Sequence, residues 1–260
     1  MFARMSVRGF RFPIVMVLLA VVLAGCGKEL QPSPSPIPTA TREIATPVGL
    51  TVGELADRIA AGWQTVDRYR SVTTIENADT PVAGETGTEV IEEVILPDQR
   101  RQVVTVDGME QSEIVAAGGN IYGRGTNLPG ISQPNRNPEV WITINGNVLG
   151  PDNSFSGFYQ SLLLPSQPPY AGLSDAKRSR PAEELDTVEI GGRQCTRYRI
   201  VDTTLTGERV VVVLALADDG LVCSIETTSV SSVSVSLFDY DQPVSIAIPA
   251  SPVPAPAENG

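Results

Sequence analysis

The sequence has no histidine, only three cysteines and few aromatic residues, and each shortage narrows the range of functions. Without histidine, the usual Ser–His and Cys–His nucleophile pairs, histidine general bases and histidine metal ligands are absent. The 19 Lys and Arg residues are outnumbered by 30 Asp and Glu residues, and the net charge is −11. Nucleic-acid-binding surfaces need clustered basic residues. We therefore expect no nucleic acid, no metal and no cofactor.

What the chain does contain is enough apolar material for a folded core. Its 260 residues are 42% hydrophobic, which is incompatible with disorder throughout. This length suits one or two domains, and a single all-β domain of about 200 residues fits it.

Residues 1–25 have the pattern of an export signal. Three arginines and no acidic residue precede an apolar run, Phe12–Ala24, which is too short for a permanent membrane span. The run ends in Leu23-Ala24-Gly25-Cys26, which resembles the lipobox of bacterial lipoproteins. The resemblance implies cleavage before Cys26, acylation of its thiol and an acyl anchor in the membrane. An ordinary secretory signal with a chance cysteine is the alternative.

Two proline-rich segments flank the predicted folded body. Residues 26–48 form a Pro/Ser/Thr-rich linker, which should be extended at ~3.1 Å per residue. Residues 250–260 have a similar composition and are predicted to be a disordered tail. Loss of the signal leaves a net charge of −14, so anionic headgroups should repel the body and hold it away from the membrane.

The body, 49–249, is predicted to begin with a helix. Thr51 and Glu54 have capping-box spacing, and apolar residues recur every three or four positions through Val66, over about five turns. A second helix is predicted from Asn153 to Leu164, where Pro165 stops it. Residues 166–184 are predicted to be a loop with at most a short helical turn.

Most of the remaining body has strand character, with turn residues between the runs. The run from Val210 to Leu216 is continuously apolar, which indicates a strand covered on both faces. A twisted antiparallel sheet of this length curls. The predicted fold class is therefore α+β, a curved antiparallel sheet with helices over its concave face. Predicted strands are 71–77, 86–96, 99–107, 112–116, 120–123, 140–144, 187–190, 194–202, 208–217, 221–230 and 232–240.

This order of elements resembles the LolA-like and LppX/LprG-like bacterial lipoproteins, whose fold is a half-open β-barrel. The resemblance covers nearly the whole body, and it depends on the order and spacing of short motifs. These are the helix Leu55-x-x-x-Ile59-x-x-x-Trp63 leading to Tyr69-x-Ser71, the turn Val94-Ile95-Leu96-Pro97-Asp98-Gln99-Arg100-Arg101, the hairpin Gly118-Gly119-Asn120-Ile121-Tyr122, Trp141, and the closing run Phe238–Ile246.

The resemblance implies that a ligand is handled by burial, without catalysis. An acyl chain gains roughly 0.8 kcal/mol for each methylene that leaves water. Phe155–Leu164, with Gly157 inside it, is the predicted lid. The predicted cavity residues are Trp63, Trp141, Phe155, Phe158, Tyr159 and Leu162, although aromatic residues at these spacings are also typical of an ordinary core.

Cys195 and Cys223 lie in an exported domain, where a disulfide is the usual state of two cysteines. In a regular meander they would lie on strands separated by a third, with Cα atoms ~10 Å apart, beyond disulfide reach. A different strand order, a bulge, or two buried thiols would each resolve the conflict.

Other suggestive groups have ordinary interpretations. Glu92 and Glu93 are neighbours on a strand, so they should point to opposite faces and cannot act as a carboxylate pair. Gly118–Gly125 is predicted to be a hairpin, not a phosphate cradle, because no helix follows it. The basic cluster Lys177–Arg180 suits an exposed loop or a headgroup contact at a cavity mouth.

Together these features predict a monomeric, non-catalytic lipoprotein, anchored through Cys26 on the extracytoplasmic face of the cell membrane. The first hypothesis is that it binds or carries a lipid or a lipidated ligand. The alternative is a sensor or interaction domain that binds a protein partner. An apolar cavity between sheet and helices, on the order of several hundred Å³, would favour the carrier.

Overall fold

The computed structural model describes residues 49–77, 87–131, 137–144, 155–204 and 207–254. The predicted signal, the linker and Cys26 lie outside these residues. The chain divides into two compact units, Met1–Ala45 and Thr46–Gly260, and only the second is described below. Among the described residues, no helix has both the length and the apolar character that a membrane span needs.

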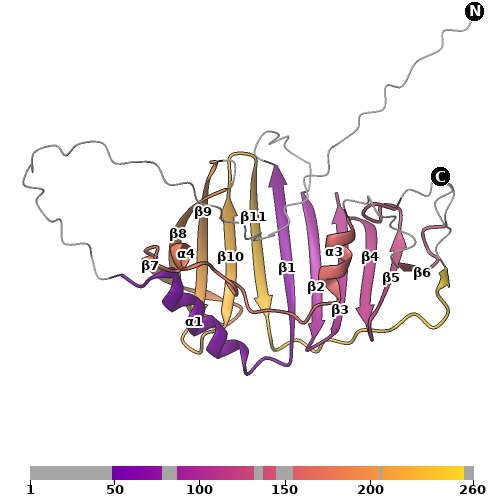
Figure 1. Ribbon diagram of the computed structural model, residues 1–260, viewed down its shortest axis with the longest axis horizontal. Helices are drawn as coiled ribbons and strands as arrows, with labels where there is room; N and C mark the ends of the chain where they lie inside the picture. The colour runs from indigo at the N-terminus through magenta and orange to yellow at the C-terminus, as the bar shows by residue number, and fades with distance from the viewer. Residues whose placement is uncertain (1–48, 78–86, 132–136, 145–154, 205–206, 255–260) are drawn as a thin grey trace, which may run out of the picture. The chain divides into compact units, whose positions relative to one another are not determined.

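Twelve strands of the described residues form one curved sheet in the order β12-β6-β5-β4-β3-β2-β1-β11-β10-β9-β8-β7 (Figure 1). Neighbours are antiparallel except β12 and β6, and β7 and β12 form the two edges, so the sheet is not closed. The predicted fold class is confirmed. The strands are β1 Arg68–Asn77, β2 Thr88–Ile95, β3 Gln99–Val106, β4 Met109–Ala117, β5 Asn120–Gly125, β6 Ile142–Ile144, β7 Glu183–Ile190, β8 Arg193–Thr203, β9 Arg209–Ala217, β10 Val222–Thr228, β11 Ser232–Asp239 and β12 Val253–Pro254.

Three described helices lie on one side of this sheet. Figure 1 shows α1 (Val52–Trp63) and α4 (Asp175–Arg178) in front of the end formed by β7 to β10. The short helix α3 (Ser156–Leu162) lies in front of the other half of the sheet. We call this side the helix face and the opposite side the open face.

The pairing register assigns each side chain to a face, because residues paired across strands point the same way. One row of partners on the helix face runs from Tyr69 through Val94 and Arg100 to Ala116, Ile121 and Ile144. It is apolar at both ends and has an arginine in the middle. The predicted hairpin at Gly118-Gly119 is confirmed, since both glycines have positive φ (57° and 76°) between β4 and β5.

The structure shortens the first predicted helix. Helix α1 has the predicted capping box, with the Thr51 and Glu54 side chains each bonded to the other's backbone N–H, but it ends at Trp63. The apolar period continues to Val66, yet the Thr65 hydroxyl donates to the Gly62 carbonyl 2.8 Å away and the chain turns there. The period alone could not show this, because the stop depends on what the helix end contacts.

Two other boundaries differ from prediction. The short helical turn allowed within the predicted loop 166–184 is present as α4, but the last two residues of that loop, Glu183 and Glu184, already pair with β8. The predicted disordered tail begins with paired residues, since Val253 and Pro254 lie in β12 alongside Ile142 and Thr143 of β6. The edge of β6 offers backbone partners that composition does not reveal.

Candidate functional site

The part of the helix face under α1, which we call the α1 half, is a tightly packed core. Leu55 and Ile59 of α1 are each 1% exposed and belong to one cluster with side chains from β8, β9 and β10. Trp63 extends this packing toward β1, where its ring centroid lies 5.3 Å from that of Tyr69. The sheet residues of the cluster are Tyr198, Ile200, Leu214, Leu216 and Val222.

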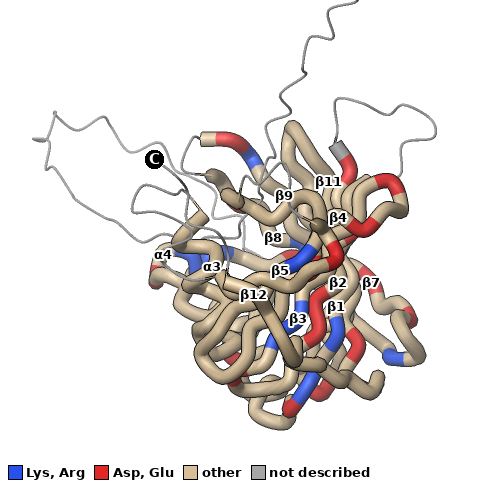
Figure 2. The backbone as a smooth tube through the Cα atoms, turned by 90° about the vertical axis from the view of Figure 1, so that its right-hand side faces the viewer, with Lys and Arg blue, Asp and Glu red and all other residues tan. Residues whose placement is uncertain are grey.

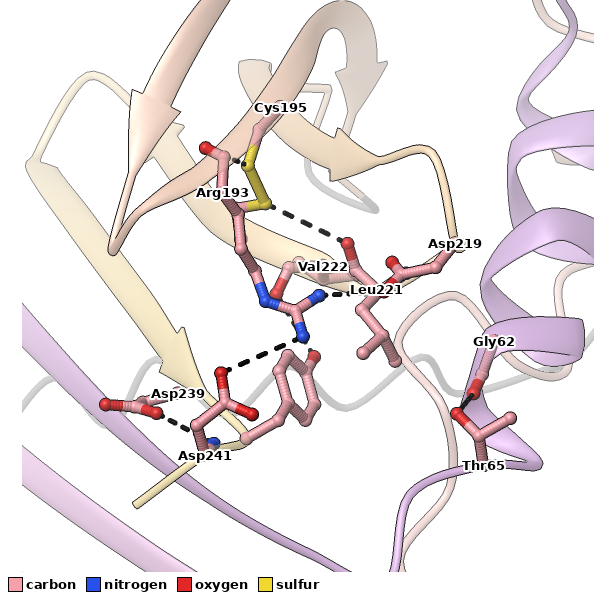
Figure 3. Close-up of polar contacts among 11 residues, drawn as sticks. Gly62, Thr65, Arg193, Cys195, Asp219, Leu221, Val222, Asp239 and Asp241 are labelled. Atoms are coloured by element: carbon pink, nitrogen blue, oxygen red, sulfur yellow. Dashed lines mark hydrogen bonds and ion pairs between the residues drawn. A yellow bond between two sulfur atoms is a disulfide. The ribbon is translucent and has the colours of Figure 1, made fainter.

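The end of α1 is fixed against the β9–β10 turn. A Cβ atom on Gly62 would lie 2.6 Å from the Gly220 carbonyl carbon, so two backbones meet there without a side chain between them. Figure 3 shows Arg193 extending toward the Asp219 carboxylate of the same turn, at 2.8 Å. The guanidinium also lies 5.8 Å from the centroid of the Tyr240 ring.

A disulfide joins Cys195 of β8 to Cys223 of β10 (Figure 3). It lies on the open face, because both cysteines cluster with Ala215 and Ala217, which alternate along β9 with residues of the helix face. The strands follow meander order, with β9 between them, yet the two Cα atoms are only 6.5 Å apart. The bulge among the predicted alternatives is present, because the β10 register shifts between Val222 and Ser224. Cys195 also pairs with Ala217, at the end of β9, so the bond crosses a small side chain.

The other end of the helix face, which we call the α3 half, has a floor of apolar side chains and a short helix in front of it. Helix α3 is seven residues long, and no side-chain hydrogen bond caps its N-terminus. It buries Phe158, Tyr159 and Leu162, and the Tyr159 hydroxyl donates to the Pro129 carbonyl at 2.8 Å. Buried floor residues on the strands are Ile114, Ala116, Ile121, Ile142 and Ile144.

A polar group separates the two halves. Arg100 lies 3.5 Å from the Glu92 carboxylate and donates to the Ser166 hydroxyl at 2.5 Å, just beyond α3. The Tyr69 hydroxyl donates to Glu92 at 3.2 Å, and burial followed by the Glu92 charge raises the pKa of that hydroxyl. We call Tyr69, Glu92, Arg100 and Ser166 the central polar group. It links the α1 half of the sheet to the segment that follows α3.

The open face has a recess of different chemistry. Its volume is about 320 Å³, and it lies between the sheet and the C-terminal segment. On its floor the buried Glu113 carboxylate accepts from Arg101 at 2.6 Å and from Arg124 at 2.6 Å. Trp141 packs under Arg124, whose guanidinium carbon is 5.3 Å from the ring centroid.

The structure brings together only some of the predicted cavity residues. Phe155 is the N-cap of α3, and Phe158 packs edge-on to Tyr159 with 5.1 Å between centroids, while Leu162 is buried one turn later. Trp63 lies on the helix face but in the α1 half. Trp141 belongs to the open face, because it directly precedes Ile142, whose side chain faces the helices.

The central polar group and Glu113 were not anticipated as site residues. The prediction that Glu92 and Glu93 point apart is confirmed, since Glu92 contacts Tyr69 and Arg100 while Glu93 contacts Arg101 on the open face. Strand alternation thus predicted that the two carboxylates lie on opposite faces. Their contacts could not be predicted, because they depend on the register between strands. The basic cluster around Lys177 is engaged instead in ion pairs with Asp57 and Asp202.

Comparison with known proteins concerns the fold. No protein-family model matches the chain, and no curated protein matches it in sequence. The structure is similar to lipoprotein LppX from Mycobacterium tuberculosis, at 12% identity and a TM-score of 0.46 over 76% of this chain and 100% of LppX. It is similar to LprF from Mycobacterium bovis at 10% identity and a TM-score of 0.46, over 78% of this chain and 100% of LprF.

A LolA superfamily protein from Nitrosomonas europaea is also similar, at 11% identity and a TM-score of 0.26, over 73% of this chain and 92% of that protein. The curved, unclosed antiparallel sheet agrees with the half-open form that the resemblance of the sequence motifs implied. At these identities the likeness extends to the fold alone.

Proposed function

We propose that this protein is a non-catalytic, extracytoplasmic lipoprotein, anchored through Cys26, that binds a lipid or a lipidated ligand in the α3 half of its helix face. We base this proposal on one observation: a helix of only seven residues lies in front of an apolar part of the sheet (Figure 1). An acyl chain that takes the place of Phe158 and Leu162 would bury its methylenes at roughly 0.8 kcal/mol each. The site needs no catalytic group for this.

The floor is occupied by the protein's own side chains in this structure, so ligand entry requires α3 to move. Helix α3 is attached by three buried side chains and the Tyr159 hydrogen bond, and the segment after it by the Arg100–Ser166 bond. Helix α3 has only seven residues, and short elements with little buried surface are the ones that open locally at low free-energy cost. We therefore assign α3 as the movable cover.

Native mass spectrometry of the compact unit Thr46–Gly260, after incubation with a total lipid extract, tests this proposal. We expect excess mass that dissociates as intact lipid. Phe158→Asp should abolish uptake because it places a charge over the apolar floor, while circular dichroism shows the sheet unchanged. Trp141→Asp is the control on the open face and should leave uptake intact. Equal uptake by both variants would refute the assignment of the site.

A second candidate, a domain that binds a protein partner, is favoured by one observation. A recess on the open face has the charged residues Arg101, Glu113 and Arg124 in its lining beside apolar residues such as Trp141 and Ile248. A clean ligand-free mass with no lipid uptake would favour this candidate, and crosslinking would then be used to find the partner.

A further inference from the structure

The segment that contains α3 differs in charge from the rest of this acidic protein. Asn153–Ser174 is the longest run in the sequence without Asp, Glu, Lys or Arg, at 22 residues, although 19% of the chain is charged. In Figure 2 the tube at α3 carries neither charge colour, whereas red and blue segments are spread over the strands. Anionic surfaces repel the acidic parts of the molecule, and this segment adds nothing to that repulsion.

The same segment carries exposed apolar side chains at the end of the helix. Three consecutive leucines occur there, and their environments differ. Leu162 is 5% exposed and attaches α3 to the floor, whereas Leu163 is 42% exposed and Leu164 is 63% exposed. Pro165 and Ser166 follow, and Ser166 is held by Arg100 of the central polar group. Two adjacent outward leucines therefore mark the C-terminal end of the proposed cover.

We propose that Leu163 and Leu164 contact a lipid bilayer, and that the uncharged residues 155–174 around them form the surface by which the domain meets the membrane. This inference rests on the proposed function and adds the place where ligand enters. An amphiphile that leaves the bilayer beside a movable α3 would reach the apolar floor without crossing water. The bilayer is the expected partner because an uncharged surface with two exposed leucines avoids headgroup repulsion and gains from apolar burial.

The test tethers the compact unit to membranes without its acyl chains. The natural sequence has no histidine, so an N-terminal hexahistidine extension of Thr46–Gly260 can be bound selectively to nickel-chelating lipid in phosphatidylcholine vesicles. A fluorophore is attached at Leu164→Cys and, in a matched variant, at Leu185→Cys. Leu185 is 39% exposed, but it lies on the acidic edge strand β7. The quencher is a nitroxide on a transmembrane peptide, which cannot enter a protein cavity.

We expect quenching at 164 to exceed quenching at 185 by about threefold or more, because burial of leucine in the bilayer boundary is favourable. Vesicles rich in phosphatidylglycerol should reduce quenching at 164, since the rest of the molecule is acidic. Equal quenching at the two positions would overturn the inference. Lipid uptake in native mass spectrometry together with equal quenching would overturn only the membrane contact. Strong quenching at 164 without uptake would refute the proposed function and leave the contact standing.

Discussion

The α1 half and the α3 half both place a helix over an apolar part of one sheet, but they fix that helix differently. Helix α1 has twelve residues, a complete capping box and a glycine contact with the β9–β10 turn. Helix α3 has seven residues and no side-chain cap. The Arg178–Asp57 pair also belongs to the α1 half. The disulfide lies at the same end of the sheet but on its open face, and the Arg193–Asp219 pair holds the β9–β10 turn there.

The difference indicates that the two halves of the helix face have different roles, one stable and one able to open. In the α1 half, the capping box, the buried α1 side chains and the Gly62–Gly220 backbone contact leave the helix little freedom. In the α3 half, a helix of seven residues lies over the floor, and its described polar contacts include the Tyr159–Pro129 and Arg100–Ser166 bonds. A protein that binds by burial needs one stable region and one region that opens at low cost.

The largest expected effect comes from removing the disulfide. Cys195→Ala with Cys223→Ala should lower the free energy of unfolding by about 3–4 kcal/mol, because the bond closes a loop with a sequence separation of 28. Urea denaturation, monitored by circular dichroism, measures this change in the free energy of unfolding. A loss below about 1 kcal/mol would show that this end of the sheet does not depend on the covalent link.

The second largest expected effect is a loss of stability at alkaline pH. Burial raises the pKa of Tyr69, Tyr170 and Tyr240 above the ordinary tyrosine value. The unfolded chain then releases these protons first, so stability is full below pH ~10 and falls as pH rises above it. Between pH 10 and 11 each tyrosine should cost about 1 kcal/mol.

Urea denaturation at pH 10 and at pH 11 measures this loss in the free energy of unfolding. Tyr69→Phe removes one titrating group and should reduce the pH-dependent loss by about a third. An unchanged loss in that variant would contradict the role of Tyr69.

Glycine substitutions should have opposite signs in the two helices. Gly62→Ala gains helix propensity but places Cβ against the Gly220 backbone, so it should destabilise by about 1–3 kcal/mol. Gly157→Ala in α3 meets no atom within 4 Å and should stabilise by about 0.5–1 kcal/mol. Thermal denaturation of both variants distinguishes them. The same sign for both would remove the structural contrast between the helices.

The last prediction concerns the Arg100–Ser166 hydrogen bond, which holds the segment after α3. Ser166→Ala removes the hydroxyl that accepts from Arg100 and should cost about 1 kcal/mol, confined to the α3 half. Hydrogen exchange should speed up about fivefold at α3 amides and remain unchanged in α1. Ser231→Ala, in an exposed turn, is the control. Faster exchange in both helices would show that they open as one unit.

Much of the fold could be predicted because its signals are local. Alternation and turn residues located the strands of the sheet, and Thr51 with Glu54 located the start of α1. The end of α1 could not be predicted, since it depends on a turn more than 150 residues away in sequence. Trp141 was grouped with the α3 aromatics because residue type does not identify the face of a short strand.

The sequence by itself determined the curved antiparallel sheet, the helix positions and the acidic character, since periodicity, turns and composition are properties of neighbouring residues. Only the tertiary structure decided which half of the helix face holds its helix firmly. A one-residue bulge brought Cys223 to Cys195, and strand register placed Arg100 between two apolar regions. Both depend on pairing between strands far apart in the chain, and no local pattern specifies the register of such a pair.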